Sequence, residues 1–199
     1  MQLDLAVLIL AAGSSSRLGS PKQLLEYAGK TLLEHAAADA MKLTPDVYVV
    51  LGHARQQCEM ALEDVGVTTL LNPYYEDGMG RSMAYAVSQI PRHEHLLIML
   101  CDQPLIPQAH YRKLIDNAKE NPTLMIASEY NAKPGVPALF PSKYYQSLQM
   151  LEGDKGAKPL LMSNTCILVP IDASYTLDID TKEDWEHFNK LKTAIEKNR

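Results

Sequence analysis

The residues best suited to chemistry stand close together near the start of the chain, in residues 8–22, LILAAGSSSRLGSPK. An apolar run gives way to glycine and serine, and two cations, Arg17 and Lys22, follow five positions apart. Small residues let the backbone approach a ligand closely, so that its N–H groups can point at phosphate oxygens. Arginine adds a planar fork of donors and lysine a point charge. The stretch therefore predicts a loop that binds a polyphosphate.

Two widespread phosphate-binding motifs do not fit the sequence. A Walker loop requires G-x-x-x-x-G-K-[S/T], but counted from Gly13 the second glycine position holds Leu18. A dinucleotide fingerprint requires G-x-G-x-x-G, and residues 78–83 read GMGRSM, in which Met83 replaces the last glycine. The sequence therefore supports neither P-loop hydrolysis nor nicotinamide binding.

Strands and helices alternate along the segment that must position this loop. Residues 5–11 are continuously apolar, which is typical of a strand buried on both faces of a parallel sheet. The alternation predicts βαβ units with right-handed crossovers, and ligands of such sheets bind at the carboxyl ends of the strands. We therefore expect an α/β fold, a three-layer Rossmann-like sheet that is mostly parallel, with helices on both faces. Further strands are expected at 47–52, 67–71, 95–101 and 124–128, and helices at 31–43, 54–64, 80–90 and 107–120.

The rhythm of the sequence changes after Ser128. The glycine- and proline-rich stretch at 133–137 predicts a turn, and short helices are expected after Phe140 and from Gly156. Short strands at 165–169 and 176–179 and a C-terminal helix from about residue 181 complete the prediction. We expect this part to be an insertion or lid beside the sheet, within a single domain over residues 1–199.

Composition excludes several classes of protein. The chain has 199 residues and a net charge of −5, and it lacks a long basic run, so sequence-independent nucleic-acid binding is not indicated. Its three cysteines are far apart without a C-x-x-C pair, which fits a reducing compartment better than a zinc or disulfide framework. No signal pattern and no apolar stretch of membrane-spanning length is present. We expect a cytoplasmic protein with neither a nucleic-acid nor a membrane partner.

The loop pattern A-A-G-x-x-x-R-x-G-x-x-K at residues 11–22 resembles the signature of nucleotidyltransferases with a glycosyltransferase-A-like fold. Within that superfamily the closest resemblance is to the MobA/MocA-like group, the molybdenum-cofactor nucleotidyltransferases. Later segments match motifs of this family: residues 72–82 resemble N-P-x-x-x-x-G-M-x-x-S, residues 100–104 L-x-D-x-P, and residues 178–184 D-I-D-T-x-E-D. The resemblance covers nearly the whole chain in the right order and implies a fold of the nucleotide-diphospho-sugar transferase type.

The resemblance implies roles for the loop cations and for two aspartates. It places Mg²⁺ at Asp102 and Asp180, since oxygen ligands and a phosphate substrate suit that ion. Lys22 would act on the phosphates and Arg17 on the leaving pyrophosphate, so that the implied catalytic residues are Lys22, Arg17 and Asp102. The implied nucleotide-binding residues are Leu10, Ala11, Ala12, Gly13, Ser14, Arg17, Lys22, Asn72, Gly78, Gly80, Ser82 and Asp102.

Simpler roles for the same residues remain open at this point. Asp102 also suits a turn in which an aspartate hydrogen-bonds to its own backbone, and Ser82 suits a helix cap. Asp180 or Thr181 would make a good N-cap for the C-terminal helix, a role that does not exclude a metal ligand. Arg81 stands where the family has a small residue, so its role is open.

The region after residue 130 is where the family recognises its acceptor. Relatives often carry G-H-P and G-D-x-G-A-R there, whereas this chain has Val136 in place of the histidine and Lys158 in place of the arginine. The implied acceptor-binding residues are Gly135, Pro137 and Asp154. We therefore expect a nucleotide-binding part at about 1–129 and an acceptor-binding part at about 130–199.

The reaction implied by the resemblance is nucleotidyl transfer, in which an acceptor phosphate attacks the α-phosphate of a nucleoside triphosphate and pyrophosphate leaves. Guanylyl members resemble L-A-G-G and cytidylyl members A-A-G, so Ala12 favours CTP over GTP. The favoured acceptor is molybdopterin, and the implied protein partner is a molybdoenzyme or its chaperone. The alternatives are a GTP-using guanylyltransferase, a sugar- or polyol-phosphate nucleotidyltransferase, a catalytically silent nucleotide-binding protein, and a purely structural α/β module.

Overall fold

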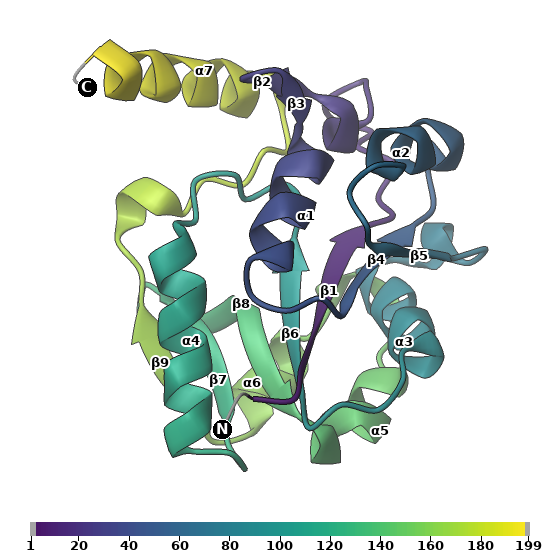
Figure 1. The fold of residues 1–199 in the computed structure, drawn as a ribbon, viewed down its shortest axis with the longest axis vertical. Coiled ribbons are helices and arrows are strands. Elements are labelled where there is room, and N and C mark those ends of the chain that lie inside the picture. Colours follow the sequence, from purple (N-terminus) through teal and green to yellow (C-terminus); the bar gives the residue numbers. More distant parts are fainter. Residues whose placement is uncertain (1–2, 198–199) are drawn as a thin grey trace.

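A seven-stranded sheet forms the centre of the protein, with strands in the order β5-β4-β1-β6-β8-β7-β9 (Figure 1). The computed structural model describes residues 3–197, so residues 1, 2, 198 and 199 of the predicted domain lie outside the described residues. The strands are β1 (Leu5–Ala11), β4 (Val47–Leu51), β5 (Thr68–Leu71), β6 (His95–Leu100), β7 (Met125–Tyr130), β8 (Lys133–Pro141) and β9 (Cys166–Pro170).

The sheet is mixed and mostly parallel. Strand β1 pairs in parallel with β4 and β6, β4 pairs in parallel with β5, and β7 pairs in parallel with β9. Among the described strands of this sheet, only β8 runs antiparallel to its neighbours, which are β6 and β7. All seven residues of β1 are buried, as expected for a central strand covered on both faces. The predicted α/β class is confirmed.

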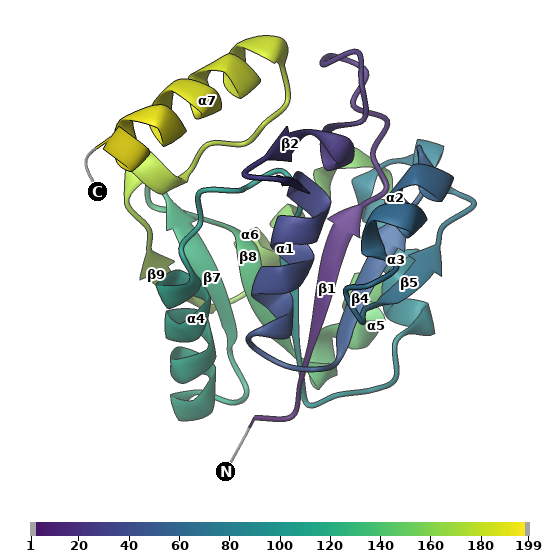
Figure 2. The same cartoon turned by 45° about the horizontal axis from the view of Figure 1, so that its top comes forward.

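Helices cover both faces of the sheet (Figures 1 and 2). Successive side chains of β1 point to opposite faces, so Val7 and Ile9 join one apolar cluster and Ala6 and Leu8 the other. The first cluster takes residues from α1 (Leu32–Met41), α2 (Arg55–Leu62) and α4 (Gln108–Glu120). The second takes residues from α3 (Met79–Gln89), α5 (Tyr145–Gln149) and α6 (Lys158–Ser163). The predicted three layers are therefore present.

The turn predicted at 133–137 is wrong, because these residues form the first half of β8. The hairpin between β7 and β8 turns instead at Asn131 and Ala132, which both have positive φ, 51° and 63°. Pro134 is tolerated in the strand because β6 pairs with β8 only from Ala138 onward, so this end of β8 has one partner strand in the described structure. The part after Ser128 is thus no insertion or lid beside the sheet, since it adds strands to it.

The strand predicted at 176–179 is also wrong. Residues 176–179 do not pair with any described strand of the sheet. The Ile179 N–H donates instead to the backbone carbonyl of Asp102 at 2.9 Å. Ile179 is fully buried with Leu32 and Phe188, which belongs to α7 (Lys182–Lys197). Burial rather than sheet pairing explains the apolar residues of this segment. The sequence also gave no sign of the small hairpin of β2 (Glu26–Tyr27) and β3 (Lys30–Thr31).

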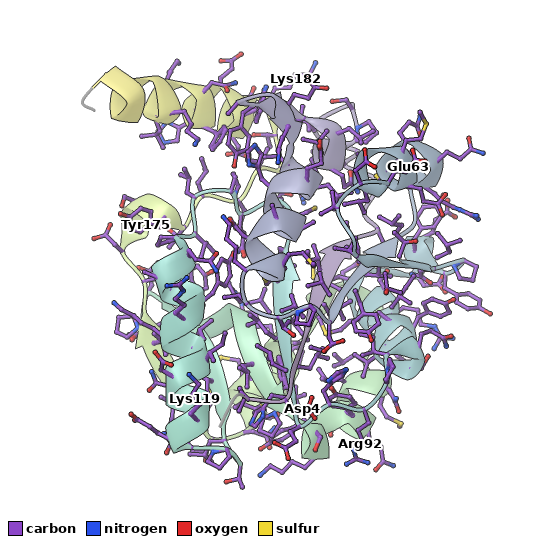
Figure 3. The ribbon with its side chains drawn as sticks, in the orientation of Figure 1. Asp4, Glu63, Arg92, Lys119, Tyr175 and Lys182 are labelled. Carbon is purple, nitrogen blue, oxygen red and sulfur yellow. The ribbon has the colours of Figure 1, made fainter. Side chains whose placement is uncertain are left out.

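Charged side chains lie on the outside of this arrangement. Figure 3 shows Glu63, Lys119 and Lys182 at the periphery of the molecule, and all three side chains are exposed. Within residues 3–197, none of the helices combines the length and the apolar character that crossing a membrane would need.

Candidate functional site

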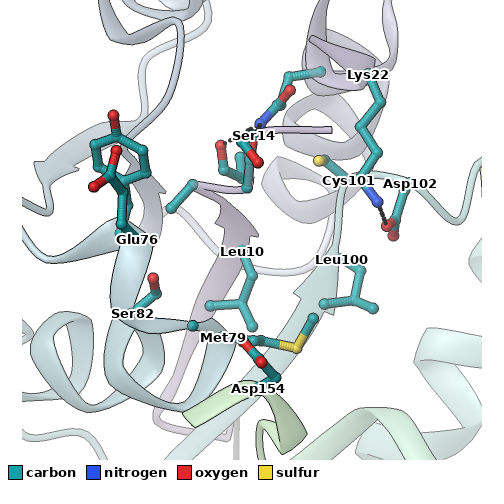
Figure 4. Close-up of a pocket in the computed structure, with 16 residues that line it drawn as sticks. Leu10, Ser14, Lys22, Glu76, Met79, Ser82, Leu100, Cys101, Asp102 and Asp154 are labelled. Carbon is teal, nitrogen blue, oxygen red and sulfur yellow. Dashed lines mark hydrogen bonds and ion pairs between the residues drawn. The ribbon is translucent and has the colours of Figure 1, made fainter. Parts of the chain in front are cut away.

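A cavity of about 380 Å³ opens at the carboxyl ends of β1 and β6 (Figure 4). We call it the first cavity. Its walls come from the end of β1 and the loop after it, from the start of α3, and from the end of β6. The lining residues are Leu10, Ala11, Ala12, Gly13, Ser14, Lys22, Gln23, Tyr75, Glu76, Gly78, Met79, Ser82, Leu100, Cys101, Asp102 and Asp154.

Gln23 holds the loop of residues 12–22 in place. Its side chain is fully buried, and Nε2 donates to the carbonyls of Ala11 (2.8 Å) and Gly13 (2.7 Å). At the other end of the loop, the Lys22 N–H donates to Ser15 Oγ at 3.0 Å, and Ser15 Oγ in turn faces Gln23 Oε1 at 3.5 Å. Gln23 is not among the site residues predicted from the sequence. The sequence offers one signal for its role, because Gln23 is a polar residue directly before two leucines, Leu24 and Leu25, which are expected to pack against the protein.

Lys22 lies between two carboxylates from distant parts of the chain. Its Nζ donates to Asp102 Oδ2 and, at 2.7 Å, to Asp180 Oδ1. The Lys22 and Asp102 side chains are only 15% and 12% exposed, whereas Asp180 is 42% exposed. Burial alone would lower the pKa of the Lys22 ammonium, but the two carboxylates raise it above its ordinary value, so the side chain is cationic at neutral pH.

Separate backbone features bring the two aspartates together. Asp102 lies two residues beyond the end of β6, and its carbonyl accepts the N–H of Ile179, which fixes the returning chain beside it. Thr181 caps α7, because its Oγ1 accepts the Asp184 N–H at 3.2 Å while Asp184 Oδ2 accepts the Thr181 N–H at 2.8 Å. Of the two predicted N-cap candidates, Thr181 supplies the cap and the Asp180 side chain turns to Lys22.

The donors at this point fit a divalent cation that is shared with phosphate oxygens. Asp102 Oδ1 is buried and has no hydrogen-bond partner among the described residues, and Asp180 offers a second carboxylate. The described residues contain no group of three or more His, Cys, Asp or Glu side chains arranged to hold a metal. Because Mg²⁺ is commonly bound through one or two carboxylates together with substrate phosphates, such a pair suits it.

Hydrogen bonds fix the opposite wall of the first cavity at the start of α3. Asn72 Nδ2 donates to Ser82 Oγ at 2.9 Å, and Asn72 Oδ1 accepts the Tyr74 N–H at 2.9 Å. Asn72 is buried behind the wall, whereas Ser82 and Gly78 line it. Gly80 packs against the carbonyl of Glu152 so closely that a side chain would not fit, and it does not line the cavity.

Arg17 does not line the first cavity with the other predicted catalytic residues, Lys22 and Asp102. Its side chain is exposed, and it is not among the described residues that line the first cavity. The neighbouring Leu18 is buried and anchors this part of the loop. The guanidinium of Arg81, whose role the sequence left open, stacks 5.2 Å from the centre of the Tyr74 ring.

A second cavity of about 420 Å³ adjoins the first and shares Met79, Leu100 and Asp154 with it. Of the predicted acceptor residues, Gly135 and Asp154 line it, whereas Pro137 is buried in β8 and does not. Its lining residues are Met79, Met83, Leu100, Gln103, Tyr130, Lys133, Pro134, Gly135, Val136, Asp154, Lys155, Ala157, Lys158, Leu161 and Asp178.

The second cavity has hydrogen-bonded polar groups and exposed lysines in its lining. Tyr130 Oη donates to the Val136 carbonyl at 2.6 Å, and Gln103 Nε2 donates to Asp178 Oδ1 at 2.9 Å. Burial raises the pKa of the Asp178 carboxyl above its ordinary value. Three exposed lysines, Lys133, Lys155 and Lys158, line the same cavity, so it can attract an anionic molecule.

A family model described as a MobA-like NTP transferase domain matches residues 7–167 of the chain. Among curated proteins, the bifunctional protein GlmU of Francisella tularensis subsp. novicida (strain U112) is 30% identical over 153 residues. That alignment covers 75% of this chain and 33% of GlmU, so the chain spans about a third of the length of the curated relatives that it matches.

Two solved structures resemble the chain over nearly its whole length. Rv0371c from Mycobacterium tuberculosis H37Rv is 29% identical with a TM-score of 0.82, over 94% of this chain and 98% of that one. The Rv0371C complex with manganese is 28% identical with a TM-score of 0.77, over 92% of this chain and 97% of that one. The fold is therefore shared with this mycobacterial protein.

Proposed function

The chain belongs to the MobA-like NTP transferase domain family, and from this premise we propose that it transfers a nucleoside monophosphate from an NTP to a phosphorylated acceptor and releases pyrophosphate. The observation that carries the proposal is the meeting of Lys22, Asp102 and Asp180 at the carboxyl edge of the sheet. A buried cation between two carboxylates, beside a cavity walled by a glycine- and serine-rich loop, suits a polyphosphate and a divalent ion. A purely structural module would leave this arrangement without a use.

In this mechanism the chain positions charges rather than moving protons. The acceptor phosphate is already anionic, so orientation and neutralisation of charge supply most of the catalysis. The backbone of residues 10–13, held by Gln23, surrounds the nucleotide, and Lys22 neutralises its phosphates. A divalent ion held by Asp102 and Asp180 supplies Lewis-acid charge to phosphate oxygens when it is bound.

We propose Mg²⁺ as that ion, because the available ligands are carboxylate oxygens and the substrate is a phosphate. The manganese complex of Rv0371C supports a divalent metal in this kind of protein and does not choose between the two ions. Arg17 enters the proposal as a residue that would have to turn toward the leaving pyrophosphate, since its side chain is exposed.

CTP is the proposed nucleotide and GTP the alternative, on the ground of the A-A-G residues at the end of β1. The proposed acceptor is molybdopterin, and a sugar or polyol phosphate is the alternative. Three lysines around the second cavity support a phosphorylated acceptor of either kind.

We also propose that the domain has a nucleotide-binding part at about 1–129 and an acceptor-binding part at about 130–199. In support, Asp154 is the single residue beyond 129 among the described residues that line the first cavity.

A thermal-shift panel with CTP, GTP, UTP and ATP, each with and without Mg²⁺, tests this function. A nucleotide at 100 times its dissociation constant should stabilise the protein by about 2.7 kcal/mol, which raises the melting temperature by roughly 5–10 °C for a chain of this size.

Pyrophosphate release is then measured with the nucleotide that gives the largest shift and with a reduced pterin phosphate, ribose phosphate or glycerol phosphate as acceptor. Lys22→Ala should abolish pyrophosphate release and reduce the nucleotide-induced shift, and Lys113→Ala, which changes an exposed lysine on α4, should keep both signals. No shift with any nucleotide and no pyrophosphate would reject the proposal.

A further inference from the structure

The Lys22 ammonium occupies the space between the two carboxylates that a divalent ion would need. Its Nζ is hydrogen-bonded to Asp102 Oδ2 and lies 2.7 Å from Asp180 Oδ1. Divalent ions contact carboxylate oxygens at roughly 2.0–2.6 Å, so an ion bound to both oxygens would have to share their space with the ammonium. Two cations at that separation repel each other strongly in a partly buried site.

The first cavity gives the ammonium room to move away from the carboxylates. Lys22 lines the first cavity together with Gly13 and Ser14, where the loop N–H groups would hold phosphates. Its backbone is held by Ser15, and the neighbouring Gln23 is fully buried, so the side chain and not the loop must move. The ammonium can therefore exchange a carboxylate for a phosphate oxygen without leaving the cavity.

We propose that Lys22 is an internal counter-cation that makes divalent-ion binding and NTP binding depend on each other. The divalent ion can bind both carboxylates once the ammonium has left at least one of them. A phosphate oxygen of the NTP then accepts the hydrogen bond that the ammonium donated to that carboxylate. This proposal rests on the proposed function, because it takes an NTP as the second ligand. It predicts weak binding of the ion alone and stronger binding of ion and nucleotide together.

Removal of the Lys22 charge separates this proposal from a purely structural ion pair. In Lys22→Met the two carboxylates face each other without a cation, and their repulsion is relieved by a divalent ion. The variant should therefore bind the ion alone more tightly than the wild type, although it loses a group that holds the nucleotide. A structural ion pair predicts the reverse, since the aspartates would lose their fixed positions.

The first measurement is a titration of Mn²⁺ without nucleotide, followed by the electron paramagnetic resonance signal of free Mn²⁺. Lys22→Met should bind Mn²⁺ at least about fivefold more tightly than the wild type, the lower end of typical coupling between sites. Lys22→Arg keeps the positive charge and is the matched control, which should bind as weakly as the wild type. Lys22→Met/Asp180→Asn should lose the gain. Lys22→Gln repeats the experiment should the methionine variant fail to fold.

The second measurement adds CTP or GTP and corrects for the metal–nucleotide complex in solution. In the wild type, nucleotide should raise Mn²⁺ affinity, and Mn²⁺ should raise nucleotide affinity by the same factor. This factor should be smaller in Lys22→Met. Equal or weaker Mn²⁺ binding by Lys22→Met in the first titration would overturn the proposal. If no nucleotide binds at all, the proposed function fails, while the titration without nucleotide still decides the role of Lys22 as a counter-cation.

Discussion

The two cavities lie side by side and are built in different ways. The first is formed by the ends of central strands and by a loop whose carbonyls are held by a fully buried glutamine. The groups that we expect to act there are backbone N–H groups, Lys22 and Asp102, together with the neighbouring Asp180. The second is lined by exposed lysines on β8, on α6 and in the turn before α6, next to apolar side chains. The loop of the first cavity is thus held by a buried side chain, whereas the cations of the second cavity are on the surface.

This difference explains why the reaction can be proposed more firmly than the acceptor. Every NTP carries the same polyphosphate, so the groups that bind it can be backbone and core residues with few alternatives. An acceptor is recognised by side chains, and substitutions on a surface cost little stability. Val136 in place of the family histidine is such a change, because it lies at the half-buried end of β8 that lines the second cavity.

The largest effect should come from Asp102→Asn in the first cavity. The change keeps the shape of a side chain that is only 12% exposed but removes the charge that pairs with Lys22. Loss of one preorganised charged contact typically lowers turnover by roughly 10²–10³-fold. Pyrophosphate release should fall by this factor, with circular dichroism unchanged.

The control for this prediction is Asp116→Asn, an aspartate on α4 whose side chain is 66% exposed and pairs with Lys119. It should retain full turnover, since surface ion pairs contribute little. The loss in Asp102→Asn should be the same with every acceptor that supports the reaction. A loss that depended on the acceptor would mean that the two cavities are not the separate units described above.

Gln23→Leu should have the next largest effect, on stability and on nucleotide binding together. It leaves the Ala11 carbonyl, which is buried, without its side-chain donor and frees the Gly13 end of the loop. An unsatisfied buried acceptor costs about 1–3 kcal/mol, which chemical denaturation measures. Gln108→Leu is a matched control, because within the described residues both polar atoms of Gln108 are buried without a hydrogen-bond partner.

The control should leave stability unchanged or raise it, since replacing unpaired polar atoms by a methyl group removes a desolvation cost. A Gln23→Leu variant as stable as the wild type, with the same nucleotide shift in a thermal melt, would show that the loop does not need its glutamine. The first cavity would then be no more firmly fixed than the second.

Much of the fold was accessible from the sequence because it follows from periodicity. The continuous apolar run of β1 and the spacing of the helices predicted the three layers, and the alternation of strand and helix predicted the parallel core. Apart from the missed hairpin of β2 and β3, the errors fall after Ser128, where local signals are misleading. Proline and glycine in 133–137 indicate a turn, yet the turn is made by Asn131 and Ala132, whose positive φ angles are set by the hairpin.

The site was accessible in part, and for a different reason. The resemblance named the loop and the two aspartates, and the structure brings Lys22, Asp102 and Asp180 together. It could not supply Gln23, whose importance lies in hydrogen bonds to two carbonyls rather than in a ligand contact. Nor could it show that Gly80 serves the packing of α3 on the Glu152 carbonyl, because that contact joins segments far apart in the sequence.

The smallest effect should appear beneath the second cavity, as a dependence of stability on pH. His110 on α4 is buried, and its Nε2 lies 2.8 Å from Ser128 Oγ, which donates to the Pro137 carbonyl of β8 at 2.7 Å. Since the serine hydrogen is used, the ring N–H donates to Ser128, and the ring supports the strand that carries Val136. Burial lowers the pKa of His110 below its ordinary value of 6.5, and the nearby Lys113 lowers it further.

The sign of the effect follows from that shift. Between the two pKa values the unfolded chain binds a proton that the folded chain does not, so stability falls as pH drops below about 6.5. The slope due to one such group cannot exceed about 1.4 kcal/mol per pH unit. Urea midpoints at pH 7.5 and 5.5 should therefore differ more for the wild type than for His110→Gln, and other titrating groups cancel in that comparison. Lys22, whose pKa is raised, stays charged over this range, so the nucleotide-induced shift should not follow the same curve. Equal pH dependence in the two proteins would remove His110 as the acid-sensitive support of the acceptor side.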